Sequence, residues 1–321
     1  MTVTLFLARR LAAVAVLLVV VSFLVFSLLT LSPGSAVSVL IGTRPVSPQL
    51  VHTIEAEYHL NDPFLVQYWH WLAGVVHLDF GQSISTAPDL SVLRLIGDRL
   101  SISVELAAYA MIIVLAVGIP AGMLAGIHRG RVADRTISTF AMLGFSAPAF
   151  AVGIVLLYIF GVELSWFPVY GEGSGTTERI QHLTLPAITF AVFLMAIIIR
   201  QTRAATLDVM QQDYITFARA RGLKPTRIMI RYALRNTALP VVTASGILLI
   251  VALSATVIVE NVFSLPGMGS LLLTSVTNKD IPVVQGLALV IAAFVITVNL
   301  IVDLLSLVID PRGRYSASGR K

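Results

Sequence analysis

Long apolar runs separated by short polar segments dominate the chain. Six runs are long enough to be helices that cross a membrane, at about 11–31, 100–127, 137–160, 186–206, 238–260 and 283–308. The hydrocarbon core of a bilayer is about 30 Å thick, and about 20 helical residues cross it. The pattern therefore predicts an all-α integral membrane protein with six transmembrane helices.

Composition agrees with this pattern. Of the 321 residues, 57% are hydrophobic and 12% charged, whereas a soluble domain is about 25% charged. No cysteine is present, which excludes disulfides, thiolate metal sites and cysteine nucleophiles. The first apolar run exceeds the about 7–15 residues of a signal-peptide core. We therefore expect it to be an uncleaved first span.

The distribution of charge predicts an orientation. With the N-terminus in the cytoplasm, 17 of the 22 basic residues fall in cytoplasmic segments, and this excess predicts both termini inside. The expected organisation is a tail and first helix over 1–31, an extracytoplasmic segment over 32–99, a transmembrane core over 100–308 and a cytoplasmic tail over 309–321. Within the core, 207–237 forms a cytoplasmic loop.

The outer segment contains signals for two short helices. Ser47-Pro48 and Asp62-Pro63 each place a capping residue before a proline suited to the first helical position. The stretch after Pro63 is rich in aromatic residues that favour a membrane interface, namely Tyr68, Trp69 and Trp71. Short helices on the outer surface are the favoured interpretation, and a packed loop without a partner is the alternative.

Signatures of catalysis are missing from the sequence. It has no phosphate-binding P-loop, no H-E-x-x-H and no G-x-S-x-G, so we do not expect an enzyme. The pairs His52/His59 and His70/His77 are each seven residues apart, two helical turns and too far to share an ion within one helix. We therefore predict no metal site.

Three acidic residues lie within or beside the apolar runs: Glu105, Glu260 and Asp303. An ionisable group inside a span is a candidate functional group. All three lie toward the ends of their runs, so we expect them at the membrane interface.

The second run contains Gly118, Gly122 and Gly126 at a spacing of four. This spacing places the three glycines on one helical face and lets a second helix approach closely. Pro120, within the same run, is a possible kink.

The stretch DYITFARARGLKPTRIMIRYALRNTALP, over 213–240, is a basic insert between two apolar runs. Asp213 is positioned to cap a short helix, Gly222 to end it, and Thr226 to cap a second helix. A capped helix with a glycine stop favours a docking element. A cluster of charge that only orients the chain is the alternative.

The same stretch resembles the cytoplasmic loop of binding-protein-dependent ABC importer permeases, often called the EAA loop. A-R-A-R-G at 218–222, followed by LRNTALP, is similar to the form in the dipeptide/oligopeptide branch. Three further segments resemble that branch in the right order: LNDPFLVQYWHWLAGVVHLDFGQS, FSLPGMGSLLLTSVTNKDIPVVQG and VDLLSLVIDPRGRY. The glutamate that names the loop is not evident here, and Arg219 or Asp213 is a possible substitute.

The resemblance implies a type I ABC importer permease in a bacterial cytoplasmic membrane. Its implied partners are a second related permease, cytoplasmic P-loop ATPase subunits that bind ATP and Mg²⁺, and an extracytoplasmic solute-binding protein. No cofactor is implied in this chain, and nucleic acid is not an expected partner. The residues that the resemblance assigns to ATPase coupling are Asp213, Tyr214, Phe217, Ala218, Arg219, Ala220 and Gly222.

Two further sets of candidate residues belong to this interpretation. Substrate-pathway candidates are Ser146, Met195, Thr243, Ser245, Ser254 and Thr256, although polar residues at such positions also serve simply to pack helices or bond backbone carbonyls. Candidates for docking of the binding protein are Trp69, Trp71, Asp79 and Asp280.

The expected substrates are dipeptides or oligopeptides. Nickel, haem and glutathione are alternatives for the same machine. An ion-coupled secondary transporter is a more distant alternative, which would show inverted repeats and broken helices. A membrane-embedded enzyme would need a catalytic cluster in the spans.

Overall fold

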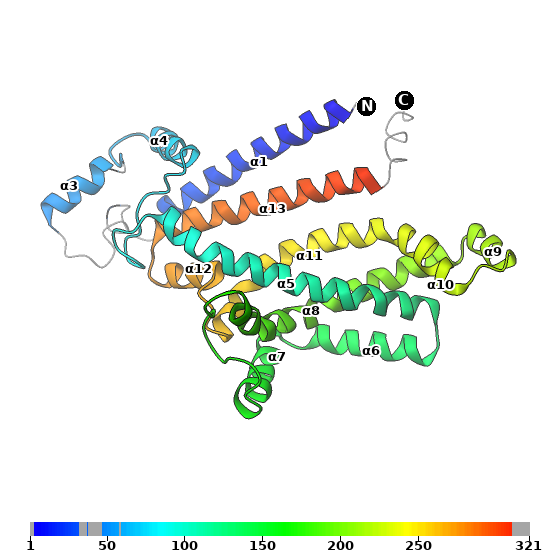
Figure 1. Cartoon of the computed structure of the whole chain (residues 1–321). Helices are drawn as coiled ribbons and strands as arrows, with labels where there is room; N and C mark the ends of the chain where they lie inside the picture. The colour runs from blue at the N-terminus through cyan, green and yellow to red at the C-terminus, as the bar shows by residue number, and fades with distance from the viewer. Residues whose placement is uncertain (1–2, 32–36, 38–46, 58, 310–321) are drawn as a thin grey trace. The chain divides into compact units, whose positions relative to one another are not determined.

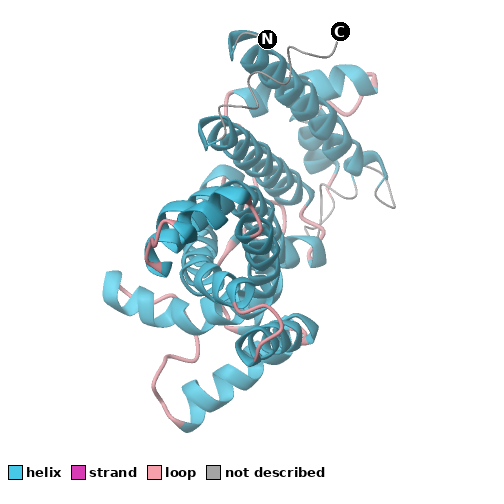
Figure 2. Cartoon of the chain, turned by 90° about the vertical axis from the view of Figure 1, so that its right-hand side faces the viewer, coloured by secondary structure: helices cyan, strands magenta, loops and turns pink. Residues whose placement is uncertain are grey.

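The computed structural model describes residues 3–31, 37, 47–57 and 59–309. In these ranges it consists of helices and loops, and its only β pairing is an isolated bridge between Gln82 and Ser91 (Figure 2). The all-α prediction is confirmed. Most of the expected C-terminal tail and the residues 32–36 and 38–46 of the outer segment lie outside the described residues.

Four helices are long and apolar enough to cross a membrane. They are α1 (Val3–Leu31), α5 (Val92–Ile127), α8 (Thr176–Met210) and α13 (Ile281–Ile309) (Figure 1). The two other expected spans are bent pairs of helices, Val132–Ser146 with Ala149–Glu163 and Pro225–Ala238 with Pro240–Leu253. The described helices therefore supply four spans, or up to six when each bent pair counts as one.

The span expected over 137–160 is not one continuous helix. α6 (Val132–Ser146) ends before Ala147, and α7 (Ala149–Leu156) starts after Pro148, at an angle of 100° to α6. Proline disfavours a helical conformation in the residue before it, and Ala147 is extended, with φ −78° and ψ 128°. A π-helix, η1 (Leu157–Glu163), continues α7.

Shorter helices occupy the segments between the long ones. They are α3 (Pro48–Glu57), α4 (Phe64–Val76), α9 (Asp213–Ala220), α10 (Pro225–Ile228), the π-helix η2 (Met229–Leu234) and α12 (Met268–Thr277); α11 (Arg235–Val262) is long but belongs to a bent pair. The two expected outer helices are thus present. α3 begins at Pro48 as predicted, whereas α4 begins at Phe64 with Pro63 as its N-cap, so Asp62 does not cap it.

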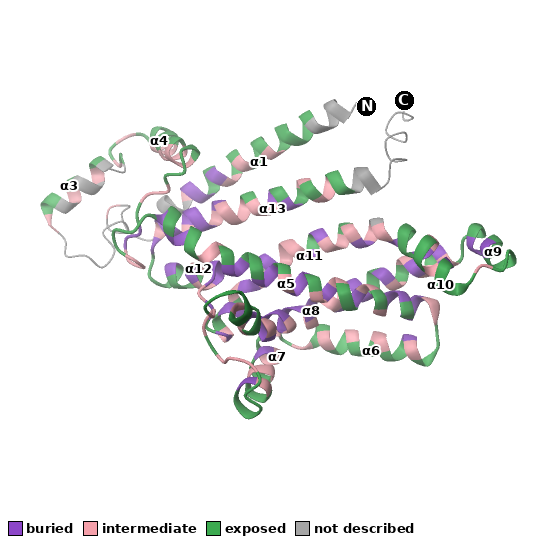
Figure 3. Ribbon diagram, in the orientation of Figure 1, coloured by how far each residue is buried: buried purple, intermediate pink, exposed green. Residues whose placement is uncertain are grey.

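The chain divides into two compact units. Of the described residues, the first comprises 104–265 and 298–309. In it, α8 packs along α6, α7 and α11, and buried residues run along α8 (Figure 3).

The glycine face of α5 lies against α8. A Cβ added at Gly122 would lie 2.7 Å from the Ile199 carbonyl oxygen and from Thr202 Cβ, and one at Gly126 would lie 2.8 Å from Thr206 Cβ. The predicted close helix approach is confirmed. Its partner is a helix of the same chain.

The second unit comprises 2–103 and 266–297. Its core is formed by the first turns of α5 together with α12 and the start of α13: Val92, Leu95, Ile96, Met268, Leu271, Val283 and Leu287. Elsewhere in this unit, α4 packs on α1. Phe26 contacts the rings of Phe64, Tyr68 and Trp71, and Ser22 Oγ lies 2.8 Å from the Tyr68 hydroxyl.

Two of the acidic residues expected at an interface have different environments. Glu105 is ion-paired with Arg179, and its side chain is 45% exposed. Glu260 is fully buried near the end of α11, so its carboxylate is enclosed by protein.

Candidate functional site

The basic insert folds around α9, a helix of eight residues. A helix this short is not stable by itself in water, so packing must hold it in place. Ile215 and Ala218, three residues apart, are its two buried residues. They join a cluster with Met123 of α5, Val209 of α8, Ile228 of α10 and Ala233 of η2.

The packing of α9 gives it two distinct faces. Ile215 is completely buried, and burying a side chain of that size contributes about 1.5–3 kcal/mol. Beside these buried residues, Tyr214 is 39% exposed and Phe217 is 70% exposed. Figure 3 shows α9 largely exposed, with its buried part turned to the neighbouring helices. A helix that is held by two buried residues thus leaves two aromatic side chains exposed.

Basic residues are also exposed in this part of the chain. Those on α9 and the segment after it that are exposed are Arg219, Arg221, Lys224, Arg227, Arg231 and Arg235. Tyr214 stacks on Tyr232, with ring centroids 6.5 Å apart. A protruding aromatic anchor with a charged rim has the anatomy of a protein-docking surface.

Gly222 ends the α9 segment as predicted. Its φ of +71° is readily adopted only by glycine. The Leu223 N–H donates to the Ala218 carbonyl and the Gly222 N–H to the Arg219 carbonyl, which satisfies the end of the helix in the manner of a glycine cap. A Cβ at Gly222 would meet nothing within 4 Å, so the constraint there is the backbone conformation.

Both expected side-chain caps in this insert are wrong. Gln212 is the N-cap of α9, without a side-chain cap bond, and Asp213 is the first helical residue. A carboxylate in a first turn is still favoured by the helix dipole. α10 begins at Pro225 with Lys224 as its N-cap, because proline suits the first helical position. Thr226 therefore lies inside the helix.

The structure separates the predicted coupling residues into two groups. Ala218 is buried against the protein's own helices, so it supports α9 and does not face outward. The other six are exposed: Asp213, Tyr214, Phe217, Arg219, Ala220 and Gly222. Ile215 was missed, although its spacing of three from Ala218 was a signal for the seated face.

The predicted substrate-pathway residues differ in their surroundings. The hydroxyls of Ser146, Ser245 and Thr256 donate to backbone carbonyls of their own helices, at 2.9, 2.7 and 2.8 Å. Met195 is half-buried beside Gly118, and Thr243 is exposed. The side chain of Ser254 lies outside the described residues.

A cavity of about 490 Å³ lies between α6 and α8. Ser146 is the one pathway candidate that lines it, together with Met142, Phe145, Arg200 and Arg203. The guanidinium of Arg203 donates two hydrogen bonds to the carboxylate of the buried Asp134, from Nε to Oδ1 at 2.6 Å and from Nη2 to Oδ2 at 2.9 Å. This pair fixes the start of α6 to α8, and the cavity is otherwise largely apolar.

Candidates for docking of the binding protein also differ in exposure. Trp69 is 68% exposed and Asp79 is exposed, whereas Trp71 packs on Phe26. Asp280 is fully buried. Its carboxylate accepts hydrogen bonds from Ser83 Oγ at 2.6 Å and from the N–H groups of Ile84, Ser85 and Thr86. It is therefore not available to a docking partner and instead anchors the loop at 83–86.

These hydrogen bonds also affect the ionisation of Asp280. Burial alone would raise the pKa of its carboxyl, but the bonds from Ser83, Thr86, Ser85 and Ile84 outweigh burial, and the pKa lies below the ordinary value of 3.8. Four donors converging on a carboxylate stabilise its charged form. We therefore expect the charge of Asp280 to be retained at neutral pH.

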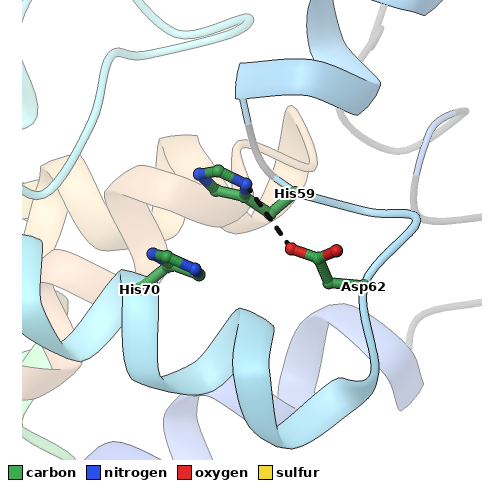
Figure 4. A group of neighbouring side chains, drawn as sticks. All are labelled: His59, Asp62 and His70. Atoms are coloured by element: carbon green, nitrogen blue, oxygen red, sulfur yellow. Dashed lines mark ion pairs between the residues drawn. The ribbon is translucent and has the colours of Figure 1, made fainter.

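One group of side chains was not expected from the sequence. His59 and Asp62, in the turn between α3 and α4, lie together with His70 of α4 (Figure 4). The two expected His pairs, spaced by seven, do not form this group, because the turn brings one member of each pair together.

Family models match most of the chain. Residues 118–315 match the model described as binding-protein-dependent transport system inner membrane component, and residues 3–107 match that of its N-terminal region. The chain belongs to this family. It is therefore an inner membrane permease component, and the resemblance noted in the sequence is confirmed.

Relatives of this permease are similar along nearly their whole length. It is 35% identical to the probable peptide ABC transporter permease protein y4tP of Sinorhizobium fredii, over 97% of this chain and 99% of the relative. It is also 35% identical to the dipeptide transport system permease protein DppB of Escherichia coli K12, over 97% and 98%. The same identity relates it to the glutathione transport system permease protein GsiC of E. coli O1:K1, over 96% and 98%.

Solved structures share the fold of this permease. A chain of the MetNI methionine ABC transporter, in an inward-facing conformation, superposes with a TM-score of 0.55 and 16% identity, covering 68% of this chain and 97% of that one. A second crystal form of MetNI gives a TM-score of 0.58 at 17% identity, covering 67% and 96%. This similarity supports the fold alone.

Proposed function

We propose that this permease is the membrane-spanning subunit of an ATP-driven importer and moves dipeptides or oligopeptides delivered by a solute-binding protein. The observation that carries the proposal is 35% identity over 97% of the chain to permeases named for peptide and dipeptide transport. The exposed aromatic and basic face of α9 adds a physical reason, because a transport subunit without a P-loop needs a surface through which an ATPase can act on it.

The proposed topology is a type I importer permease with six spans and both termini in the cytoplasm of a bacterium. Seventeen of 22 basic residues then face the cytoplasm, as the positive-inside rule expects. Apolar side chains on α6 remain exposed, including Phe140 at 69%, Met142 at 72% and Leu143 at 60%. An exposed apolar surface of this kind is suited to contact with lipid or with a second permease related to this one.

In this proposal α9 is the coupling helix and enters a groove of the cytoplasmic ATPase. Phe217 is the anchor, and Arg219 supplies a polar contact in the absence of the family glutamate. Since Ile215 and Ala218 attach α9 to α5, α8, α10 and η2, movement of the ATPase pair transmits to those helices. ATP-driven closure then rocks the permease between inward- and outward-facing packed states.

The remaining parts of the machine lie outside this chain. ATP and Mg²⁺ bind the ATPase subunits, and this subunit catalyses no reaction itself. A second permease completes the translocation pathway. The solute-binding protein docks on the outer segments, where Trp69 and Asp79 are the exposed candidates.

Glutathione import is the second candidate function, because the glutathione permease GsiC is as similar to this chain as the dipeptide permease is. Nickel and haem are further alternatives for the same architecture. The 100° break between α6 and α7 is a feature that an ion-coupled transporter would also show. Membership of the permease family favours the importer.

The test is reconstitution of the permease with its partner subunits and binding protein in liposomes. We expect ATP-dependent uptake of a labelled dipeptide, with glutathione as the competing substrate. Phe217→Ala should weaken ATPase docking by about 2 kcal/mol, or about thirtyfold. Thr216→Ala, also exposed on α9, is the matched control. Uptake without ATP would refute the proposal of an ATP-driven importer. Preferential uptake of glutathione would show that glutathione, and not a dipeptide, is the substrate.

A further inference from the structure

The turn between α3 and α4 has a backbone held in place by specific bonds. His59 adopts a positive φ of 52°, an uncommon conformation that histidine tolerates better than most residues. The Asp62 N–H donates to the His59 carbonyl at 3.0 Å. Gln67 of α4 donates from its amide to the carbonyls of Leu60 and Asp62, at 3.1 and 2.8 Å. The turn is thereby tied to the helix that carries His70.

Three potential metal ligands meet at this turn (Figure 4). The ligand atoms of His59, Asp62 and His70 all lie within 4.8 Å of one another. The imidazole rings of His59 and His70 are stacked, with centroids 4.2 Å apart, and His59 Nδ1 lies 3.6 Å from Asp62 Oδ2. The side chains of His59 and Asp62 are 46% and 42% exposed, so an ion can reach them from solvent.

We propose that His59, Asp62 and His70 bind one divalent transition-metal ion of the Zn²⁺ type. Two imidazoles and one carboxylate are donors that such ions accept, and water fills the remaining positions. A tetrahedral ion with bonds of about 2.0–2.1 Å requires donors about 3.3 Å apart. Rotation of the three exposed side chains supplies this approach, because the backbone bonds described above already hold their Cα atoms together.

A bound metal ion would join the turn that follows α3, through His59 and Asp62, to the second turn of α4, through His70. An ion that binds the folded segment and not the unfolded one stabilises it in proportion to its occupancy. The site therefore acts as a metal clip on the α3–α4 segment, and its existence does not depend on the proposed transport function.

The other histidines of this region provide matched controls. His52 belongs to α3 and lies 3.8 Å from Glu55. His77 follows α4, and its Nδ1 lies 2.7 Å from the Ala73 carbonyl oxygen. Both are exposed, as His59 and His70 are. Neither belongs to the three-ligand group.

The experiment is titration of the full-length permease in detergent, purified with a tag that contains no histidine, with Zn²⁺ against a chromophoric chelator. We expect one Zn²⁺ per chain. His59→Ala and His70→Ala should each weaken binding about tenfold or more, since loss of even an outer-shell partner costs that much. His52→Ala and His77→Ala should bind as the unsubstituted chain does.

X-ray absorption at the Zn edge, on the unsubstituted chain, provides a measurement that does not depend on the folding of a variant. Two imidazole ligands are the expected result. No binding, one-to-one binding that survives the double change His59→Ala/His70→Ala, or loss of binding in the control variants would each overturn the proposal.

Discussion

α9 and the loop at 83–86 are both short segments held in place by residues distant in the sequence, yet different forces hold them. Ile215 and Ala218 seat α9 in an apolar cluster. The loop at 83–86 is anchored by one buried carboxylate, that of Asp280, which receives bonds from one hydroxyl and three N–H groups. The first arrangement depends on shape and volume. The second depends on charge.

This difference in the stabilising forces affects how each segment can behave when a transporter changes conformation. Apolar packing is short-ranged and non-directional, so α9 can transmit force through several helices at once. Hydrogen bonds to a buried carboxylate are directional, and the cost of leaving them unmade is large. We infer that the loop at 83–86 is built to be fixed, whereas α9 is built to move together with its neighbours.

The largest effect should come from removing the carboxylate. Asp280→Ala leaves the N–H groups of Ile84, Ser85 and Thr86 without their acceptor, and we expect a loss of at least about 3 kcal/mol in the free energy of unfolding. Thermal unfolding in detergent and protease cleavage at 83–86 measure it. Asp79→Asn, at an exposed residue, should stay within about 0.5 kcal/mol. Equal midpoints for the two variants would contradict the anchoring role.

The second-largest effect should come from a change in the apolar cluster that holds α9 in place. Ile215→Ala creates a cavity in a fully buried position, and we expect about 2–4 kcal/mol of local destabilisation. ATP-driven uptake should fall although Tyr214, Phe217 and Arg219 are unchanged. Thr216→Ala is the control on the same helix. Full uptake by the Ile215 variant would mean that the cluster does not hold the docking helix.

A smaller effect should come from the end of α9. Gly222→Leu forces a residue with a Cβ into φ +71°, at a cost of about 1–2 kcal/mol, and it should weaken ATPase docking while membrane insertion stays normal. Gly222→Asn should be milder, because asparagine tolerates this conformation. Co-purification of the ATPase with each variant is the measurement. An ordering in which Asn is the worse substitution would argue against backbone strain.

The smallest effect should appear in the response to pH. The pKa of Asp280 is lowered by folding, so its contribution to stability is complete above the ordinary value of 3.8. It declines as pH falls toward the lower pKa of the folded state, because the unfolded chain takes up the proton first. Melting temperatures between pH 7 and pH 3 should therefore fall further for the unsubstituted chain than for Asp280→Asn. Parallel curves would disprove this linkage.

Features encoded by local periodicity could be predicted. The spacing of Gly118, Gly122 and Gly126 predicted a close helix approach, and α8 of the same chain provides it. The glycine stop at Gly222 also follows from a local rule. The break at Ala147-Pro148 was likewise visible in the sequence, but the length of the apolar run around it suggested one helix.

Features that depend on contacts between distant segments could not be predicted. Asp280 meets Ser83 across 197 positions of sequence, and an isolated aspartate in an outer loop resembles any surface acid. His59 and His70 are brought together by a turn in which Gln67 donates hydrogen bonds to the backbone carbonyls of Leu60 and Asp62. Spacing within one helix gave no sign of that pairing.

The most direct test of the coupling role of α9 is a photo-crosslink from Phe217, replaced by a photoreactive aromatic residue, in native membranes. Trp69 is the matched control, since it is 68% exposed against 70% for Phe217 and is expected on the opposite side of the membrane. We expect mass spectrometry to identify a P-loop ATPase crosslinked to position 217 and not to position 69. Crosslinks from 217 only to lipid or to the permease itself, in an assembled transporter, would contradict it.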